Sequence, residues 1–521
     1  MLPNKKNIHN ILFILYLALV SLVISGVLPR TIVPFLTLIT SIYILLIPIE
    51  DSAIFFVRSI PFFIAIPITT GFDSLNMWRV FSGLIFIKWF IEQRHFNFVF
   101  YKSKTPPQKT TLILLGILLL AILSIAQAQS YVLSIKRIIY FVNLSLIGIV
   151  INNLIKQNQD FSQRVVKNIA IPTIIVALIG LAQQISTYYL DIFQFVDFWG
   201  GVVERNLFGN LWAETAIRAN TWFAYFGNQL SLRIFSIFPD SHSFPIFLLL
   251  GMPAVMALSL EKVVEKNRGL KTMFKTRASM TVLFVPLIFL AAILSGTRGI
   301  WVAGFISTIW ALIIIWLHYS SAINSDKRSI FKYIASYLGI FFLLFGVAYY
   351  IIASDQFMVQ KDSTGLFAKR AKSIIDISET SNARRIEIWK DSVKSIIKHP
   401  LLGVGIGNFP VVVGEDLARA KAGSSAHNLY LHIAAELGIP ALILALWFLW
   451  FLLKQAYSNF THHSSSNILS SIFYAGSLIF LPWVLIYSLT DVAIFDERAF
   501  LLFVVTIAII FGQKENGQAA D

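Results

Sequence analysis

The chain of 521 residues contains no cysteine, which excludes disulfide bonds, thiolate catalysis and cysteine-ligated zinc. It is also poor in charge, because only 13% of its residues are charged whereas 57% are hydrophobic and 14% are aromatic. One soluble core cannot bury so much apolar surface, and the mean hydropathy of +0.73 is typical of a membrane protein. The composition therefore predicts an all-α polytopic membrane protein, and no residue pattern in it indicates a metal or a cofactor.

The few charges are mostly positive, with a formal net charge of +15. In a soluble protein this excess would favour nucleic acid, but cytoplasmic loops of membrane proteins are also rich in Lys and Arg and face anionic lipid. We therefore expect membrane lipids as partners and no nucleic acid. The N-terminal apolar run continues to Leu28 without a small-residue cleavage site, so we expect a first span that is retained.

Apolar runs of about the length that a bilayer requires predict about 12 to 14 transmembrane helices with both chain ends in the cytoplasm. The third run is interrupted by Arg58, Pro61 and Pro67. The expected spans are 11–28, 31–49, 52–70, 77–91, 110–126, 132–152, 168–188, 244–260, 279–294, 299–317, 333–353, 428–453, 468–489 and 500–511.

The basic residues orient these spans. The most basic loop, 262–277, is expected in the cytoplasm, which places two polar segments and the turn carrying Arg298 on the outer side. Lys136 and Arg137, near the outer end of the sixth span, are interpreted as contacts to lipid headgroups. We divide the chain into N-terminal helices (1–189), an extracytoplasmic loop (190–240), helices carrying the Arg298 turn (241–354), a large, partly helical extracytoplasmic loop (355–426) and C-terminal helices (427–521).

A polar island, residues 382–440, stands out in this apolar chain. Its first part carries apolar residues at spacings of three and four and ends before Pro400, which predicts an amphipathic helix on a surface. The sequence GVGIGN follows, whose glycines allow a close approach of the backbone. His427 then comes directly before a long apolar run, so we expect it at the outer membrane surface, where that helix begins.

The order of residues in the island resembles a known family. It runs Arg385, Trp389, His399-Pro400, Gly403-x-Gly405-x-Gly407-Asn408-Phe409, His427-Asn428 and Glu436-x-Gly438-Ile439-Pro440. This order is similar to that of the O-antigen ligase and polymerase superfamily of bacterial envelope glycosyltransferases. Arg233 in RIFSIFPDSHSF and Arg298 in SGTRG resemble the two arginine motifs of the superfamily, although Pro239-Asp240 stands where Pro-Asn is usual.

The resemblance implies a fold of the GT-C type and a metal-independent, inverting glycosyltransferase. The donor would be a glycan on undecaprenyl pyrophosphate, at the outer, periplasmic face of a bacterial inner membrane. Arg233, Arg298 and Arg385 would bind the pyrophosphate, because guanidinium groups are permanently charged and grip phosphate in a bidentate manner. His427 would take the proton of the acceptor hydroxyl.

Each of these residues also has a simpler interpretation. An outer arginine can contact a lipid headgroup or anchor the end of a helix, and His427 can cap one. The other histidines are weaker candidates: His462 and His463 lie in a Ser-rich loop, and His432 lies off the helix face that His427 would occupy. GVGIGN also lacks the preceding strand of a dinucleotide-binding loop.

Several functions remain open at this point. A lipid A core acceptor defines a ligase, another glycan chain defines a polymerase, and a protein hydroxyl defines an oligosaccharyltransferase. A membrane transporter, for example of bicarbonate, is an alternative of another class. A transporter would show ionisable residues deep within its spans, and Arg58 is the best such residue in the sequence.

Overall fold

The structure is a computed structural model that describes residues 5–69, 72–94, 109–219, 221–226, 229–265, 279–319, 325–358, 380–415, 417, 424–462 and 467–513. Three features expected from the sequence fall outside these residues, in whole or in part: most of the cytoplasmic loop 262–277, part of the segment 355–426, and His463.

The described chain is an all-α polytopic membrane protein. Its long helices are α1 (Lys5–Ile24), α2 (Val33–Leu46), α3 (Ile49–Ser59), α4 (Met77–Arg94), α5 (Lys109–Ser124), α6 (Tyr131–Gln157), α7 (Asp160–Ser186), α11 (Ser243–Glu265), α13 (Ser279–Leu294), α14 (Arg298–Tyr319), α15 (Ser325–Ala353), α19 (Ile439–His462), α20 (Ile468–Tyr487) and α21 (Glu497–Phe511).

These helices follow the expected spans with two corrections. The third span, expected over 52–70, is helical only as far as Ser59. A 3-10 turn containing Pro61 follows, and then strand β1 (Ala65–Ile66) pairs with β2 (Leu75–Asn76). The proline has no N–H to continue the helix.

Among the described residues, seven helices have the length and hydropathy of a membrane span, and four shorter apolar helices accompany them.

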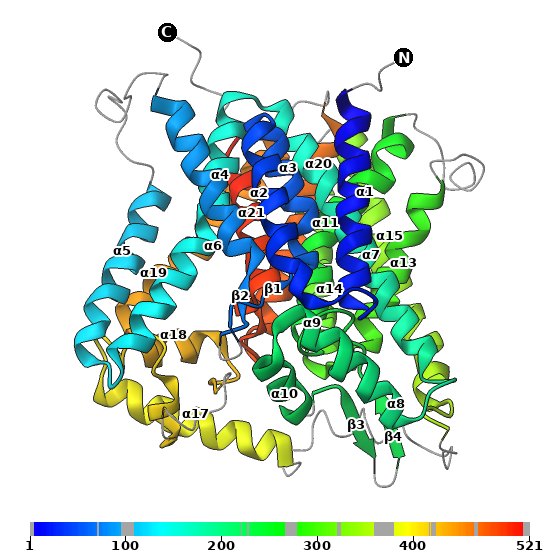
Figure 1. The fold of residues 1–521 in the computed structure, drawn as a ribbon. Helices are drawn as coiled ribbons and strands as arrows, with labels where there is room; N and C mark the ends of the chain where they lie inside the picture. Colours follow the sequence, from blue (N-terminus) through cyan, green and yellow to red (C-terminus); the bar gives the residue numbers. More distant parts are fainter. Residues whose placement is uncertain are drawn as a thin grey trace.

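The second correction concerns the span expected over 428–453. It is two helices, α18 (Leu429–Leu437) and α19, because Gly438 has φ 86 and breaks the helix between them. α18 therefore runs in a different direction from α19 and lies near α17 of the polar island (Figure 1).

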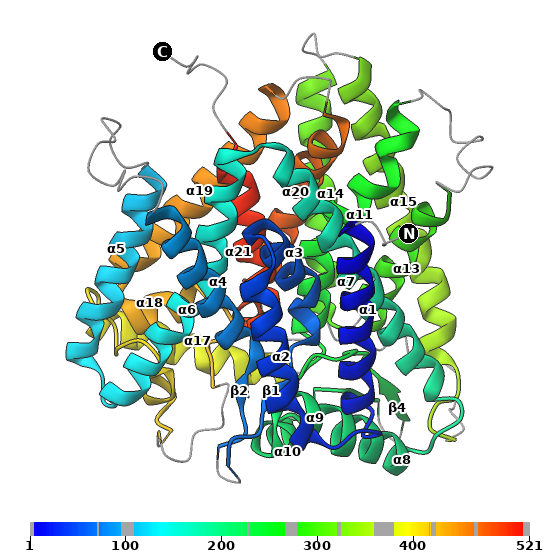
Figure 2. The same cartoon turned by 45° about the horizontal axis from the view of Figure 1, so that its top comes forward.

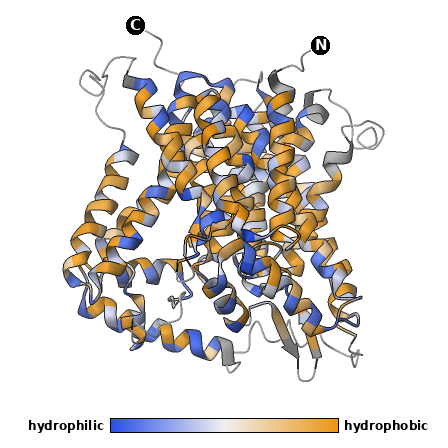
Figure 3. Ribbon diagram, in the orientation of Figure 1, coloured by the Kyte–Doolittle hydropathy of each residue, from blue (hydrophilic) through white to orange (hydrophobic). Residues whose placement is uncertain are grey.

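Helices α11 and α20 form the centre of the bundle. The apolar stretch of each of these helices is 94% buried, whereas that of α5 is only 17% buried. Small residues allow this close packing. Gly251 of α11 lies against Thr173 of α7, and Gly476 of α20 lies against Pro253 of α11. The exposed apolar side chains face outward around the bundle, where the ribbon is mostly hydrophobic (Figure 3).

The two polar segments lie on the face opposite to that at which α1 begins and α21 ends (Figure 1). The first contains α8 (Ile192–Val196), a π-helix (Asp197–Glu204), α9 (Arg205–Phe208), α10 (Asn210–Ala219) and the hairpin of β3 (Phe223–Phe226) and β4 (Gln229–Leu232). The second contains α17 (Thr380–Lys398), the expected amphipathic helix, which lies across this face. In both views α5, α6, α18 and α19 stay together at one edge of the bundle (Figure 1 and Figure 2).

The glycine-rich motif of the island approaches the protein's own backbone. Val404 N–H donates to Ala435 O (2.9 Å), and Gly405 N–H donates to Glu436 O (3.0 Å). A β-carbon on Gly438 would collide with the carbonyl of Leu401, and one on Gly403 would collide with the carbonyl of Ala435. The close approach that the glycines predicted is therefore a seam between the motif and α18.

Asn408 ties the same motif to the turn between α5 and α6. Its Oδ1 accepts from Ser130 N–H (2.8 Å), and its Nδ2 donates to Ser134 Oγ (2.9 Å). Ser134 Oγ in turn donates to Ile406 O (2.7 Å). The glycine-rich motif is thus fixed on two sides, to α18 within the island and to the membrane helix α6.

Two charged side chains inside the bundle escaped the sequence analysis, which named Arg58 alone. Lys88 of α4 donates to the carbonyls of Ile44 and Ile47. Arg498 of α21 is 1% exposed and donates to carbonyls of Ile237 and Phe63. Both cations replace water with backbone oxygen atoms, which makes their burial tolerable.

We predict that Gly438→Ala destabilises the protein by at least about 1–2 kcal/mol, because alanine has a β-carbon that disfavours a left-handed backbone. The same substitution at Gly346 in α15 is the matched control, since no atom lies within 4 Å of a β-carbon there. Thermal unfolding of the detergent-solubilised protein is the measurement. Equal melting temperatures for the two variants would contradict the seam.

We also predict that a cysteine replacing Lys390 in α17 is labelled by a membrane-impermeant thiol reagent in intact spheroplasts, whereas one replacing Asn158 after α6 is not. Both positions are exposed, and the absence of native cysteine removes any background. The reverse labelling pattern would invert the expected orientation of the chain.

Candidate functional site

The four residues singled out in the sequence come from separate segments of the chain. Arg233 follows strand β4, Arg298 is the first residue of α14, Arg385 lies in the first half of α17, and His427 precedes α18. The structure brings these segments together around a carboxylate that the sequence analysis did not name, that of Asp491, just beyond α20.

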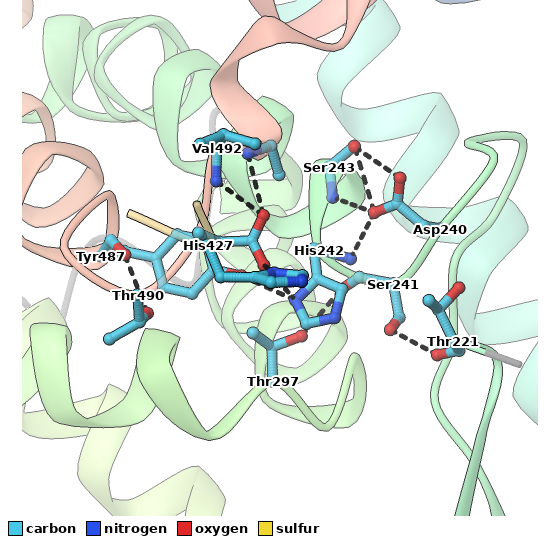
Figure 4. Close-up of polar contacts among 12 residues, drawn as sticks. Thr221, Asp240, Ser241, His242, Ser243, Thr297, His427, Tyr487, Thr490 and Val492 are labelled. Atoms are coloured by element: carbon cyan, nitrogen blue, oxygen red, sulfur yellow. Dashed lines mark hydrogen bonds and ion pairs between the residues drawn. The ribbon is translucent and has the colours of Figure 1, made fainter. Parts of the chain in front are cut away.

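Asp491 is the hub of this cluster. Its Oδ1 accepts the backbone N–H groups of Val492 (2.8 Å) and Ala493 (3.0 Å). Its Oδ2 faces three cationic or ionisable groups, at 3.5 Å from His242 Nδ1, 3.6 Å from His427 Nδ1 and 4.0 Å from Arg385 Nη2. Figure 4 shows the side chains of His242, His427 and Tyr487 pointing toward one another beside Val492.

The backbone holds His427 in an unusual conformation. Its φ is 45, in the left-handed region that few residues other than glycine adopt. The neighbouring groups fix it there: Trp389 Nε1 donates to Ala426 O (2.9 Å), and Asn428 caps α18 by accepting from Tyr430 N–H (3.0 Å). Strain of this kind at a polar site is typical of a functional residue. The side chain remains 40% exposed, so a substrate can reach it.

Arg233 lies deeper. Its Nη2 donates to Thr297 Oγ1 (3.3 Å), next to Arg298, and its Nε donates to Ser295 O (3.4 Å). Burial, together with the positive charges of Arg298 and Arg385, lowers the pKa of Arg233 to about 10. Arg233 still carries its charge at neutral pH. The three guanidinium groups therefore share one electrostatic environment.

His242 has its tautomer set by its neighbours. Its Nε2 lies 3.4 Å from Arg233 Nη2, and because arginine only donates, Nε2 is the acceptor. The proton must then sit on Nδ1, which is 2.8 Å from the hydroxyl of Tyr487. Burial lowers the pKa of His242 to about 3, so the ring is neutral at physiological pH.

Asp491 behaves in the opposite way. Burial by itself raises the pKa of its carboxyl, but the contacts with His427 and Arg385 outweigh burial and hold the pKa well below its usual range. The Asp491 carboxylate is therefore charged at neutral pH.

Asp240, which departs from the usual Pro-Asn of the family motif, has a structural role. Its Oδ1 accepts the N–H groups of His242 (2.8 Å) and Ser243 (2.7 Å) and so caps the start of α11. Asparagine and aspartate are equivalent at such a position. The departure therefore leaves the placement of His242 intact.

The remaining histidines of the sequence analysis lie elsewhere. His432 is 4% exposed and stacks on Phe409 with ring centroids 4.9 Å apart, and His462 ends α19. In the part of the chain that the structure describes, no group of three or more His, Asp or Glu side chains is arranged to hold a metal ion.

Sequence analysis missed His242, Tyr487 and Asp491. His242 stands within the same RIFSIFPDSHSF motif as Arg233, which was a usable signal. Asp491 gave a weaker one, as an acidic residue directly after an apolar span on the outer side.

The model of the O-antigen ligase family matches residues 283–446 of the chain. No curated protein matches the chain. The matched stretch contains Arg298, Arg385 and His427. It leaves out Arg233, His242 and Asp491, which the fold brings to the same place.

The low pKa of His242 predicts a dependence of stability on pH. The folded value of about 3 lies below the ordinary value of 6.5, so as pH falls below 6.5 the unfolded state binds the proton first and the folded state loses stability. Between pH 6.5 and 5 the loss is roughly 2 kcal/mol. Melting temperatures of His242→Gln should therefore fall less steeply with acidification than those of the wild type, and parallel curves would contradict a buried neutral His242.

Proposed function

We propose that this chain, placed in the O-antigen ligase and polymerase superfamily by the match over residues 283–446, moves a glycan from undecaprenyl pyrophosphate to an acceptor hydroxyl. The reaction would take place at the outer face of a bacterial inner membrane. The observation that carries the proposal is the convergence of three arginines with a histidine and an aspartate from distant segments of the chain.

The arginines suit the pyrophosphate of the donor. The positive charges of Arg298 and Arg385 both act on Arg233, so the three guanidinium groups together create a positive field that favours an anion. Arg298 also opens α14, and the N-terminus of a helix attracts phosphate through its free N–H groups and its dipole. As the glycosidic bond breaks, these groups would stabilise the charge that builds up on the departing pyrophosphate, without a metal ion.

His427 is the proposed general base, and Asp491 orients it. With Nδ1 directed at Asp491, the lone pair of Nε2 is free to take the proton of the acceptor hydroxyl. The acceptor oxygen then attacks the anomeric carbon, the bond from that carbon to the pyrophosphate oxygen breaks, and its electron pair leaves with the pyrophosphate. Attack from the face opposite to the leaving group inverts the configuration of the anomeric carbon. The separation of 3.6 Å is long for a hydrogen bond, but such contacts tighten when substrate binds.

The superfamily includes both ligases and polymerases, and their acceptors distinguish them. A ligase would use a lipid A core, and a polymerase would use another lipid-linked glycan. In a strain lacking the protein, loss of a ligase leaves finished chains on the lipid carrier, whereas loss of a polymerase leaves single repeat units on the envelope lipid.

A transporter, for example of bicarbonate, fits the described structure less well. Three ionisable residues within the described part of the bundle have fixed polar partners: Arg58 bonds to Asn10 and Asn168, and Lys88 and Arg498 bond to backbone carbonyls. A transported ion would need exchangeable partners along its path, which these three residues do not offer.

We predict that His427→Gln lowers glycan transfer by about 10²–10⁴, since an amide keeps some hydrogen bonding but cannot take a proton. Asp491→Asn should lower it by about tenfold or more, because an amide no longer fixes the tautomer of the base. The measurement is complementation of a deletion strain, with envelope glycans resolved on a gel at matched expression.

Asp391→Asn is the matched control for the carboxylate, because Asp391 lies on the exposed side of α17 and pairs only with Lys394 among the described residues. Wild-type transfer by His427→Gln would reduce His427 to a cap of α18. Loss of transfer in Asp391→Asn as well would show that any charge change in this region is disruptive.

A further inference from the structure

Two arginines outside the site described above flank one aromatic ring. The guanidinium carbon of Arg79, near the start of α4, and that of Arg137, in the second turn of α6, each lie 5.5 Å from the ring centroid of Tyr140. They are therefore no farther apart than twice that distance. Arg79 also lies 5.2 Å from the ring of Trp78, and Arg137 lies 5.4 Å from that of Phe141.

Neither guanidinium forms an ion pair or a hydrogen bond with any residue that the structure describes. The Nε of Arg79 is completely buried and has no partner. The carboxylate of Glu497, in the same region, accepts instead from Asn76 and from Trp78 (2.6 and 2.7 Å). Other half-buried arginines of this chain are paired, as Arg30 is with Asp73 at 2.9 Å.

The pair is turned inward and differs from an ordinary lipid anchor. Lys136, the neighbour of Arg137, is exposed on the outside of α6, where a headgroup contact is expected. Arg137 lies beneath the island, and a β-carbon on Gly407 would be 3.3 Å from its Cβ. The sequence predicted that Lys136 and Arg137 both contact lipid headgroups, but only Lys136 has the exposed position that such a contact requires.

A short rigid connection joins the pair to the proposed active site. The hydroxyl of Tyr140 donates to Phe495 O (3.1 Å), the last residue of the 3-10 turn Ala493–Phe495. Asp491, the hub of the site, holds the first residue of the same turn through its N–H. Asp491 and Phe495 are four residues apart, which is at most about 14 Å of chain, so the arginine pair and the proposed active site are connected through one short turn.

We propose that Arg79 and Arg137 form a second anion site, which binds a phosphate group of the acceptor substrate. The proposal rests on the proposed function, in which the first site holds the pyrophosphate of the donor. The anion is either the pyrophosphate of a second lipid-linked glycan or a phosphate on an envelope glycolipid. Each guanidinium stacks on Tyr140 and keeps N–H groups for a bidentate grip on phosphate. The one carboxylate described beside them, that of Glu497, is hydrogen-bonded to Asn76 and Trp78, so the guanidinium N–H groups remain available to a phosphate.

The experiment counts anion sites with a short polyprenyl pyrophosphate. Farnesyl pyrophosphate is titrated calorimetrically into the full chain in phosphatidylcholine nanodiscs. The wild type should bind two equivalents. Arg298→Gln should lose one of them, and the double variant Arg79→Gln/Arg137→Gln should lose the other. Lys136→Gln, which removes the adjacent charge, is the matched control and should keep both.

Folding is monitored within the same titration, because the double variant should retain the site that contains Arg298. If the double variant loses both equivalents, the single variants Arg79→Lys and Arg137→Lys are titrated in its place. Each should weaken binding of the second equivalent about tenfold, because an ammonium group cannot form the bidentate contact. A single equivalent in the wild type, or two in the double variant, overturns the second site.

A repeat in phosphatidylglycerol nanodiscs separates substrate from bulk lipid. Two equivalents in both lipids support a substrate site, whereas loss of the second equivalent in phosphatidylglycerol assigns the pair to membrane headgroups and overturns the acceptor role. In transfer assays the double variant should raise KM for the acceptor about tenfold or more while kcat is kept. If the wild type binds two equivalents but transfers nothing, the proposed function fails and the anion site stands.

Discussion

The arrangement of the candidate site depends on keeping the buried carboxylate of Asp491 charged. The Asp491 carboxyl is held by two backbone N–H groups on one oxygen and draws His242, His427 and Arg385 to the other. Without that negative charge, Arg233, Arg298 and Arg385 would repel one another. The repulsion is strong because the site is partly buried, and in its lower dielectric constant Coulomb energies are several times larger than in water. The same carboxylate therefore gathers His242, His427 and Arg385 from segments far apart in the chain.

Hydropathy predicted the helices, because a bilayer imposes the same length and polarity on every span. The places where the prediction failed have local causes. Pro61 ends α3 early, and Gly438 divides the expected span after His427 into α18 and α19. Both residues break a helix through their effect on the backbone. Hydropathy averaged along the sequence does not detect this effect, because it depends only on the polarity of the side chains.

The candidate site was predictable only in part. Arg233, Arg298, Arg385 and His427 belong to recognisable motifs, whereas Asp491 does not. Asp240, Asp491 and Asp496 each accept backbone N–H groups at a turn, so local sequence assigns all three the same role of a cap. Only the contact of Asp491 with residues far away in the chain distinguishes it, and such contacts are a property of the fold. The unpaired state of Arg79 and Arg137 was hidden for the same reason.

The glycine seam has a bearing on how mutational data from this protein should be interpreted. Its hydrogen bonds run from backbone to backbone, so the side chains of Val404 and Ile406 can vary in detail, whereas Gly403 and Gly438 tolerate no β-carbon. A saturation scan would therefore record the glycines as being as intolerant as His427. That intolerance would come from packing, and an assay that scores growth alone would not distinguish a residue that shapes the scaffold from one that performs chemistry.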